Sequence, residues 1–153
     1  MNPASLAAQF SSKTDLHSTP QDFFDKLNEE FHFELDVCAT PQNAKCEHYY
    51  YLGKTNGLDA PWHEHADVAW MNPPYGRQIS LWIRKAAEES AKGMTVVALL
   101  PARTDTKYFH KYIYQKPNVE IRFVSGRLKF GDAKSSAPFP SMVVVFRPSP
   151  GAL

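Results

Sequence analysis

The segment Asn72-Pro73-Pro74-Tyr75 holds the residues of this chain that are best suited to do chemistry. Proline fixes its own backbone and restricts the residue before it, so the segment is a stiff turn with free carbonyl groups. The Asn72 side-chain oxygen and the Pro73 carbonyl can accept both hydrogens of a planar amino group, and the Tyr75 ring offers a face on which a heteroaromatic ring can stack. The segment therefore predicts an amino-group clamp. The alternative is a rigid strand-to-helix turn in which Tyr75 only packs.

The clamp must be positioned by the strand before it and by a neighbouring strand that carries a carboxylate. Residues 66–71 are predicted as a strand that stops at Asn72, because two prolines cannot continue a central ladder. Residues 33–39 are predicted as an earlier buried strand with Asp36 near its end. Ligands of open α/β sheets collect beyond the carboxyl ends of the strands. We therefore expect Asp36 and Asn72 on one rim of a sheet.

Helices and strands alternate along most of the chain. A helix is predicted to open at Thr19, which can cap it, with Pro20 in the first helical position. Residues 41–65 lack clear periodicity and are predicted as loop with at most one short strand. The remaining periodic segments predict helices over 79–92, ended by Gly93, and 104–114, and strands over 95–100, 119–124, 128–130 and 141–147. This order predicts an α/β fold with a mostly parallel sheet and an antiparallel edge strand.

A single domain is expected, because the 153 residues are 43% hydrophobic and are too few for two ordinary domains. Residues 1–16 are expected to form a flexible arm, followed by the domain over 17–148. No segment reaches the ~20 apolar residues of a membrane span, and no signal-peptide pattern is present. We therefore expect a cytoplasmic protein with free thiols at Cys38 and Cys46.

Basic residues are concentrated in the C-terminal third of the chain. Residues 1–100 contain 8 Lys and Arg against 13 Asp and Glu, whereas residues 101–153 contain 9 against 3. The net charge of +1 conceals this separation. A basic third is typical of nucleic-acid contact, although an ordinary solvated surface explains it equally well.

The segment around Asn72 and a series of further motifs resemble the phage-type DNA N6-adenine methyltransferases, which use S-adenosylmethionine. The resemblance runs over about residues 17–147. The matching segments are Thr19-Pro20-Gln21, Leu35-Asp36-Val37-Cys38-Ala39, Asn43-Ala44-Lys45-Cys46, Asn56-Gly57-Leu58-Asp59, Asn72-Pro73-Pro74-Tyr75-Gly76-Arg77, Leu100-Pro101-Ala102-Arg103-Thr104-Asp105-Thr106 and Gly126-Arg127-Leu128-Lys129-Phe130. This resemblance implies a single-domain Rossmann-like methyltransferase fold and methyl transfer to a flipped adenine in DNA.

The resemblance also implies roles for individual residues. Thr19 and Pro20 would touch the methionine part of the cofactor, and Asp59 would face the amino group of the cofactor adenine. Asp36, Cys38 and Ala39 would form the first cofactor loop. Asn72, Pro73, Pro74 and Tyr75 would hold the target base, with Asn72 also next to the cofactor, and Phe130 would stack on the other face of the base. Arg103, Arg127 and Lys129 would contact phosphates of the DNA.

Some features depart from this pattern, and other functions stay open. The loop Cys38-Ala39-Thr40-Pro41 lacks the glycines of the wider methyltransferase class, no segment is long enough for a separate target-recognition domain, and no acidic ribose ligand is assigned. The same clamp would serve an RNA adenine or a protein glutamine, and a catalytically silent nucleic-acid-binding module is a further alternative. Cys46, His48, His63 and His65 match no established zinc spacing, so we expect no metal. A monomer is favoured, and protection of DNA from nucleases is one possible purpose.

Overall fold

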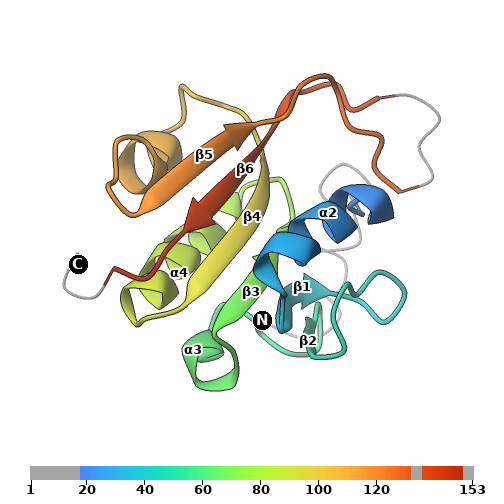
Figure 1. The fold of residues 1–153 in the computed structure, drawn as a ribbon, viewed down its shortest axis with the longest axis vertical. Coiled ribbons are helices and arrows are strands. Elements are labelled where there is room, and N and C mark those ends of the chain that lie inside the picture. Colours follow the sequence, from blue (N-terminus) through green and yellow to red (C-terminus); the bar gives the residue numbers. More distant parts are fainter. Residues whose placement is uncertain (1–17, 132–135, 150–153) are drawn as a thin grey trace.

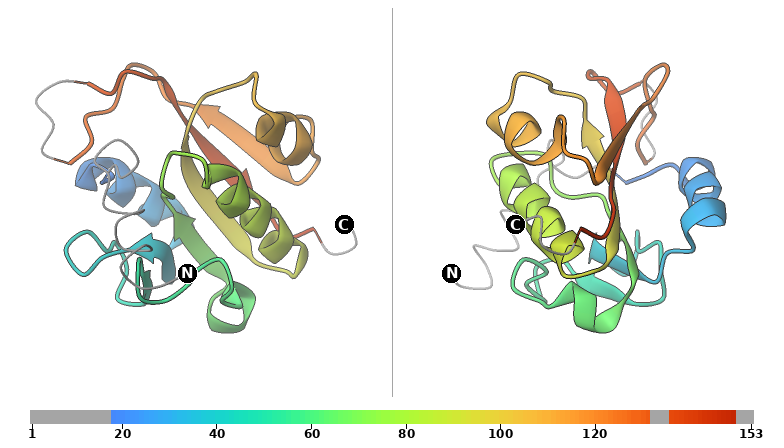
Figure 2. Two further views of the ribbon diagram at one scale, coloured as in Figure 1. Left: turned by 180° about the vertical axis from the view of Figure 1, so that it is seen from behind. Right: turned by 60° about the vertical axis from the view of Figure 1, so that its left-hand side comes forward.

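The structure is a computed structural model that describes residues 18–131 and 136–149. These residues form a six-stranded sheet with helices on both of its faces (Figures 1 and 2). The predicted arm, residues 1–16, lies outside the described residues. Among the described helices, none has the length and apolar character needed to cross a membrane.

The sheet has the strand order β2-β1-β3-β4-β6-β5. Its strands are β1 (Leu35–Ala39), β2 (Tyr49–Tyr51), β3 (Val68–Met71), β4 (Thr95–Pro101), β5 (Val119–Phe123) and β6 (Ser141–Phe146). Strands β2, β1, β3 and β4 run parallel, whereas β6 pairs antiparallel with both β4 and β5. The predicted α/β fold with a mostly parallel sheet is therefore confirmed.

The predicted position of the antiparallel strand is corrected. Strand β6 lies second from the edge, and β5, which runs parallel to β4, forms the edge itself. Every residue of β6 is buried, whereas all residues of β5 are at least partly exposed. A strand that is mostly apolar gains most where it has neighbours on both sides, so β6 occupies the inner position.

Helix α2 (Gln21–Phe31) covers one face of the sheet, and α4 (Ile79–Ala91) covers the other (Figure 2). On the first face, Phe24 of α2 meets the Trp70 ring edge-on at 5.3 Å. On the second face, Trp62 and Trp82 are buried and stack at 6.4 Å. Gly93 has a φ of +107° and follows Lys92, the C-cap residue of α4, so its predicted role as the stop of this helix is confirmed.

Three local predictions differ from the structure. Residues 128–130 form no strand but lie in the connection between β5 and β6, where Leu128 receives a backbone hydrogen bond from Ala137 rather than from a strand. The helix predicted over 104–114 contains the π-helical segment η1 (Phe109–Ile113), and the Thr106 hydroxyl accepts from the Phe109 N–H at 3.3 Å. The predicted loop contains α3 (Trp62–His65), which is too short to produce a periodic pattern.

Candidate active site

A cavity lies on the face of the sheet that α2 covers, next to the start of that helix. Asp36 pairs with Trp70 in the β1–β3 register, and alternate residues of a strand point to the same face, so Asn72 faces the same side as Asp36. The wall of the cavity includes five of the predicted site residues, namely Thr19, Asp36, Cys38, Asn72 and Pro73. The structure thus brings the carboxylate and the amide together.

Asp36 is a buried carboxylate in this cavity wall, with 2% of its surface exposed. It is the second residue of β1 and not near its end, as the sequence had suggested. Its two oxygens accept hydrogen bonds from uncharged backbone groups, the N–H of Cys38 at 3.2 Å and the N–H of Lys45 at 3.0 Å. Burial raises the pKa of Asp36 to about 7, although the two backbone hydrogen bonds oppose this change.

Asn72 directly follows β3 and contacts the segment that precedes α2. Its Nδ2 donates a hydrogen bond to the Thr19 Oγ1 at 2.9 Å. The prediction that Thr19 caps α2 is therefore wrong: Pro20 occupies the cap position, no side chain caps the helix, and the Thr19 hydroxyl is directed to Asn72 instead. Pro73 and Pro74 are both buried, which agrees with a rigid turn.

Tyr75 is enclosed by the connection between β5 and β6. Its hydroxyl donates to the Leu99 carbonyl at 2.8 Å, and 5% of the residue is exposed. Phe130 and Phe139 meet its ring in T-shaped arrangements, with centroids 6.3 and 5.6 Å away. Burial raises the pKa of the Tyr75 hydroxyl, which therefore stays protonated. Tyr75 and Phe130 are thus neighbours, as the resemblance implies, and Phe139 is an additional aromatic that the sequence did not single out.

The basic residues expected at the rim lie near these aromatics. The Arg103 guanidinium lies over the Phe139 ring at 5.8 Å, and the Arg127 Nη1 donates to the Ala137 carbonyl at 3.4 Å. Both residues and Lys129 are exposed. In contrast, Arg122 pairs with Glu30 and Glu120, and Arg147 also pairs with Glu120. Three basic residues of the C-terminal third are therefore exposed near the aromatic cluster.

Three further predicted cofactor residues do not line the cavity. Pro20 accepts the first backbone hydrogen bond of α2, from Phe24, and Ala39 accepts one from Leu52 at 2.6 Å. Asp59 is exposed and accepts from the Asn56 Nδ2 at 2.7 Å. Asp59 borders a surface hollow shared with Arg84 and Glu88 of α4, on the face opposite α2. This placement lends no support to the role expected for Asp59.

Sequence reasoning missed Asn43 and Lys45, which also line the cavity. The Asn43 Oδ1 accepts from the Thr40 N–H at 2.8 Å and so closes the loop that follows β1. The Lys45 Nζ donates to the Gln21 Oε1 at 2.8 Å, across to α2. Burial lowers the pKa of Lys45, although the nearby Asp36 carboxylate opposes this change. Both residues lie in a motif that carries the family resemblance, which was the available signal.

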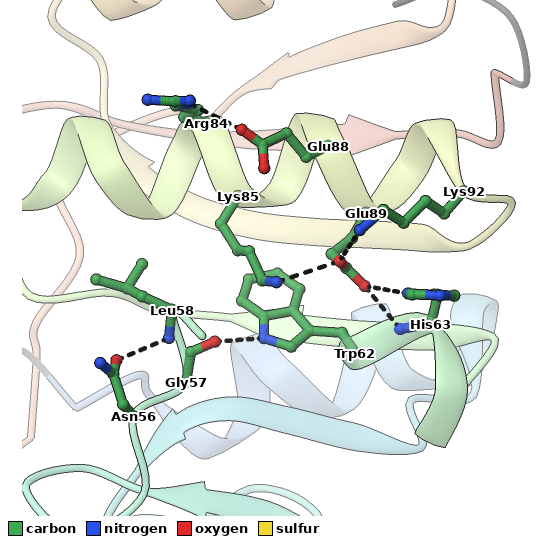
Figure 3. Close-up of polar contacts among 10 residues, drawn as sticks. All are labelled: Asn56, Gly57, Leu58, Trp62, His63, Arg84, Lys85, Glu88, Glu89 and Lys92. Carbon is green, nitrogen blue, oxygen red and sulfur yellow. Dashed lines mark hydrogen bonds and ion pairs between the residues drawn. The ribbon is translucent and has the colours of Figure 1, made fainter. Parts of the chain in front are cut away.

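Glu89 is a second buried carboxylate, and it is 0% exposed. It accepts from the backbone N–H of His63 at 2.7 Å and contacts the His63 Nδ1 at 2.8 Å, and it pairs with Lys85 at 3.2 Å and Lys92 at 3.3 Å (Figure 3). These cations and hydrogen bonds outweigh burial and lower the pKa of Glu89. His63, considered above as a zinc ligand, thus belongs to an ionic cluster. Among the described residues, no three His, Cys, Asp or Glu side chains form a metal-binding group.

Comparison with known proteins places the chain among DNA methyltransferases. The family model described as DNA N-6-adenine-methyltransferase (Dam) matches residues 7–151, and the chain belongs to this family. A protein of Haemophilus phage HP1 (strain HP1c1) named DNA N-6-adenine-methyltransferase is 30% identical over 145 residues, which cover 90% of this chain and 81% of the relative. A protein of Escherichia phage T1 with the same name is 34% identical over 96 residues, which cover 62% of this chain but 39% of the relative.

Proposed function

We propose that this chain transfers a methyl group from S-adenosylmethionine to the N6 amino group of adenine in DNA. Membership of the adenine methyltransferase family supports the reaction. The structural observation that carries the proposal is the shared cavity, in which the buried Asp36 carboxylate lies beside the Asn72-Pro73 turn. Residues 17–148 would form one methyltransferase domain of the Rossmann-like kind.

The chemistry of the cavity wall fits the amino-acid end of this cofactor. Asp36 is buried beside backbone donors without charge, so a cationic ligand group would stabilise its ionised form. Lys45 lines the same cavity and would complement a ligand carboxylate. S-adenosylmethionine supplies an ammonium, a carboxylate and a methyl group on positively charged sulfur. We therefore assign its methionine part to Asp36 and Lys45, with Cys38 in the adjoining wall.

The Asn72-Pro73 turn would activate the adenine amino group. The lone pair of this nitrogen is delocalised into the ring, so the nitrogen is a poor nucleophile while it stays planar. The Asn72 side-chain oxygen and the Pro73 carbonyl would each accept one of its hydrogens. These two bonds strengthen as the nitrogen becomes pyramidal and positively charged, and the stabilisation is therefore greatest in the transition state. No strong general base is needed for this step.

The aromatic cluster would receive a base that has left the DNA stack. An amino group inside a duplex is out of reach, and flipping the base costs a few kcal/mol, which stacking on Tyr75 offsets. In this structure Phe130 and Phe139 approach Tyr75 edge-on, so the rings leave no parallel slot for a base. Binding of DNA would therefore have to move the connection between β5 and β6. Arg103, Arg127 and Lys129 would contact the phosphates beside the flipped base.

Methyl transfer to defined substrates tests this proposal. The protein is incubated with S-adenosylmethionine labelled in the methyl group and with unmethylated DNA, matched RNA or glutamine-containing peptides in parallel, and the products are hydrolysed and separated. We expect the label in N6-methyladenine from DNA. Label in RNA or in glutamine would transfer the activity to that substrate, and cofactor binding without any transfer would favour the silent nucleic-acid-binding module.

A further inference from the structure

The contact between Thr19 and Asn72 joins two segments that are 53 residues apart in the sequence. Thr19 immediately precedes the cap of α2, and Asn72 immediately follows β3. The Asn72 Nδ2 donates to the Thr19 Oγ1 at 2.9 Å, and 4% of Thr19 is exposed. Both residues line the cavity. The hydrogen bond is therefore partly buried in the wall of the cavity.

The two ends of the Asn72 amide have opposite hydrogen-bonding properties. Its oxygen accepts hydrogen bonds, whereas its NH2 group only donates them. An amide with its NH2 group toward the substrate would place donor against donor at the adenine N6. In the structure the nitrogen end donates to the Thr19 hydroxyl, an arrangement that turns the oxygen end away from Thr19. We propose that Thr19 is a positioning residue that fixes the orientation of the Asn72 amide for catalysis, an inference that rests on the proposed function.

The surroundings of Thr19 hold it in place for this role. Pro20 has a φ of −56° and starts α2 directly after it. Helix α2 is fixed to β3 through Phe24, whose ring meets Trp70 at 5.3 Å. Trp70 lies on β3, two residues before Asn72, which directly follows this strand. The donor and the acceptor of the Thr19–Asn72 bond are thus carried by two elements that pack against each other, so their spacing is determined by the core.

Thr19→Val tests the inference, because valine keeps the shape of threonine and removes the hydroxyl. We expect the single-turnover methylation rate at saturating cofactor and DNA to fall roughly 10-fold or more, the size of effect expected when a group that acts in the transition state loses one hydrogen bond that positions it. The dissociation constant for S-adenosylhomocysteine, measured by calorimetry, should change less than twofold. Thr19→Ser should restore most of the rate. Thr95→Val, the same change at the distant start of β4, is the matched control and should leave both values unchanged.

An Asn72→Asp background sharpens the test. A carboxylate accepts through either oxygen and has no wrong orientation, so Thr19→Val should have little further effect on whatever rate that background retains. The side-chain NH2 resonances of Asn72 provide a readout without turnover. They should shift in Thr19→Val and return in Thr19→Ser, and thermal unfolding verifies that each variant is folded.

Two results would overturn the inference while the proposed function stands. In the first, wild type methylates DNA and Thr19→Val is equally active. In the second, Thr19→Val weakens cofactor binding and keeps the full rate, which would make Thr19 a cofactor contact. A wild-type protein that binds cofactor and methylates no DNA would instead overturn the proposed function itself.

Discussion

Two buried carboxylates, Asp36 and Glu89, lie at different places along the sheet and have opposite surroundings. Asp36 is 2% exposed and borders the cavity at α2, where its hydrogen bonds come from two neutral backbone groups. Glu89 is 0% exposed and lies near the end of α4, where His63, Lys85 and Lys92 surround it (Figure 3). Glu89 is therefore paired with cationic side chains at hydrogen-bond distance and contributes to the fold, whereas Lys45 acts on Asp36 through its backbone N–H and the charge of its side chain.

The pKa values of Asp36 and Glu89 are shifted in opposite directions, in line with their different surroundings. The pKa of Asp36 is raised to about 7, so the folded chain takes up a proton that the unfolded chain releases, and the contribution of Asp36 to stability is lost as the pH rises from about 4 to 7. The pKa of Glu89 is lowered, so its contribution is present above the usual range of glutamate and is lost as the pH falls. A cationic ligand group would stabilise the ionised form of Asp36, which supports the role in cofactor binding proposed for it.

Glu89→Gln should give the largest change in stability. It leaves Lys85 and Lys92 without their carboxylate, and breaking a buried ionic cluster costs about 3 kcal/mol, which lowers the melting temperature by roughly 6–12 °C in a chain of this size. Cofactor affinity should be unchanged where the variant is folded. Glu88→Gln is the control, because Glu88 is the neighbouring residue and forms an exposed ion pair with Arg84. It should lower the free energy of unfolding by less than about 1 kcal/mol. An unchanged melting temperature for Glu89→Gln would remove the contrast between the two carboxylates.

Asp36→Asn should weaken cofactor binding and leave the stability of the fold unchanged or higher, the reverse of the effects expected for Glu89→Gln. The loss of a charged hydrogen bond to the ligand should weaken binding of S-adenosylmethionine roughly 10- to 100-fold, as measured by calorimetry. The melting temperature of the ligand-free protein at pH 8 should stay the same or rise, because the buried charge is gone. Asp67→Asn, an exposed position directly before β3, serves as control. Full affinity in Asp36→Asn would place the cofactor elsewhere.

The affinity for cofactor should also depend on pH, and this effect should be smaller than the effects of the two substitutions above. Because the pKa of Asp36 is about 7, the cavity is increasingly protonated below that pH and loses its attraction for a cation. The dissociation constant should rise roughly tenfold between pH 8 and pH 6. The dependence should flatten in Asp36→Asn. A wild-type affinity that is constant over this range would show that Asp36 is ionised throughout.

The turn at Asn72-Pro73-Pro74 and the parallel core were predictable because local chemistry determines them. The prolines after Met71 end a strand wherever they occur in a sheet, and the buried run around Asp36 needs neighbours on both sides. Long-range contacts were not predictable in this way. Three such contacts join residues that are far apart in the sequence. They are the hydrogen bond from Asn72 to Thr19, the insertion of β6 between β4 and β5, and the packing of Phe139 on Tyr75.

The most direct test of the account is the single-turnover methylation rate of Asn72→Ala on unmethylated DNA, with the product identified by nucleoside analysis. We predict that wild type forms N6-methyladenine and that the variant is roughly 100-fold slower or more, because one acceptor of the transition-state charge is missing. Its affinity for S-adenosylhomocysteine should be nearly that of wild type. A variant with the wild-type rate would contradict the account, since the amino group would then be activated somewhere other than the Asn72-Pro73 turn.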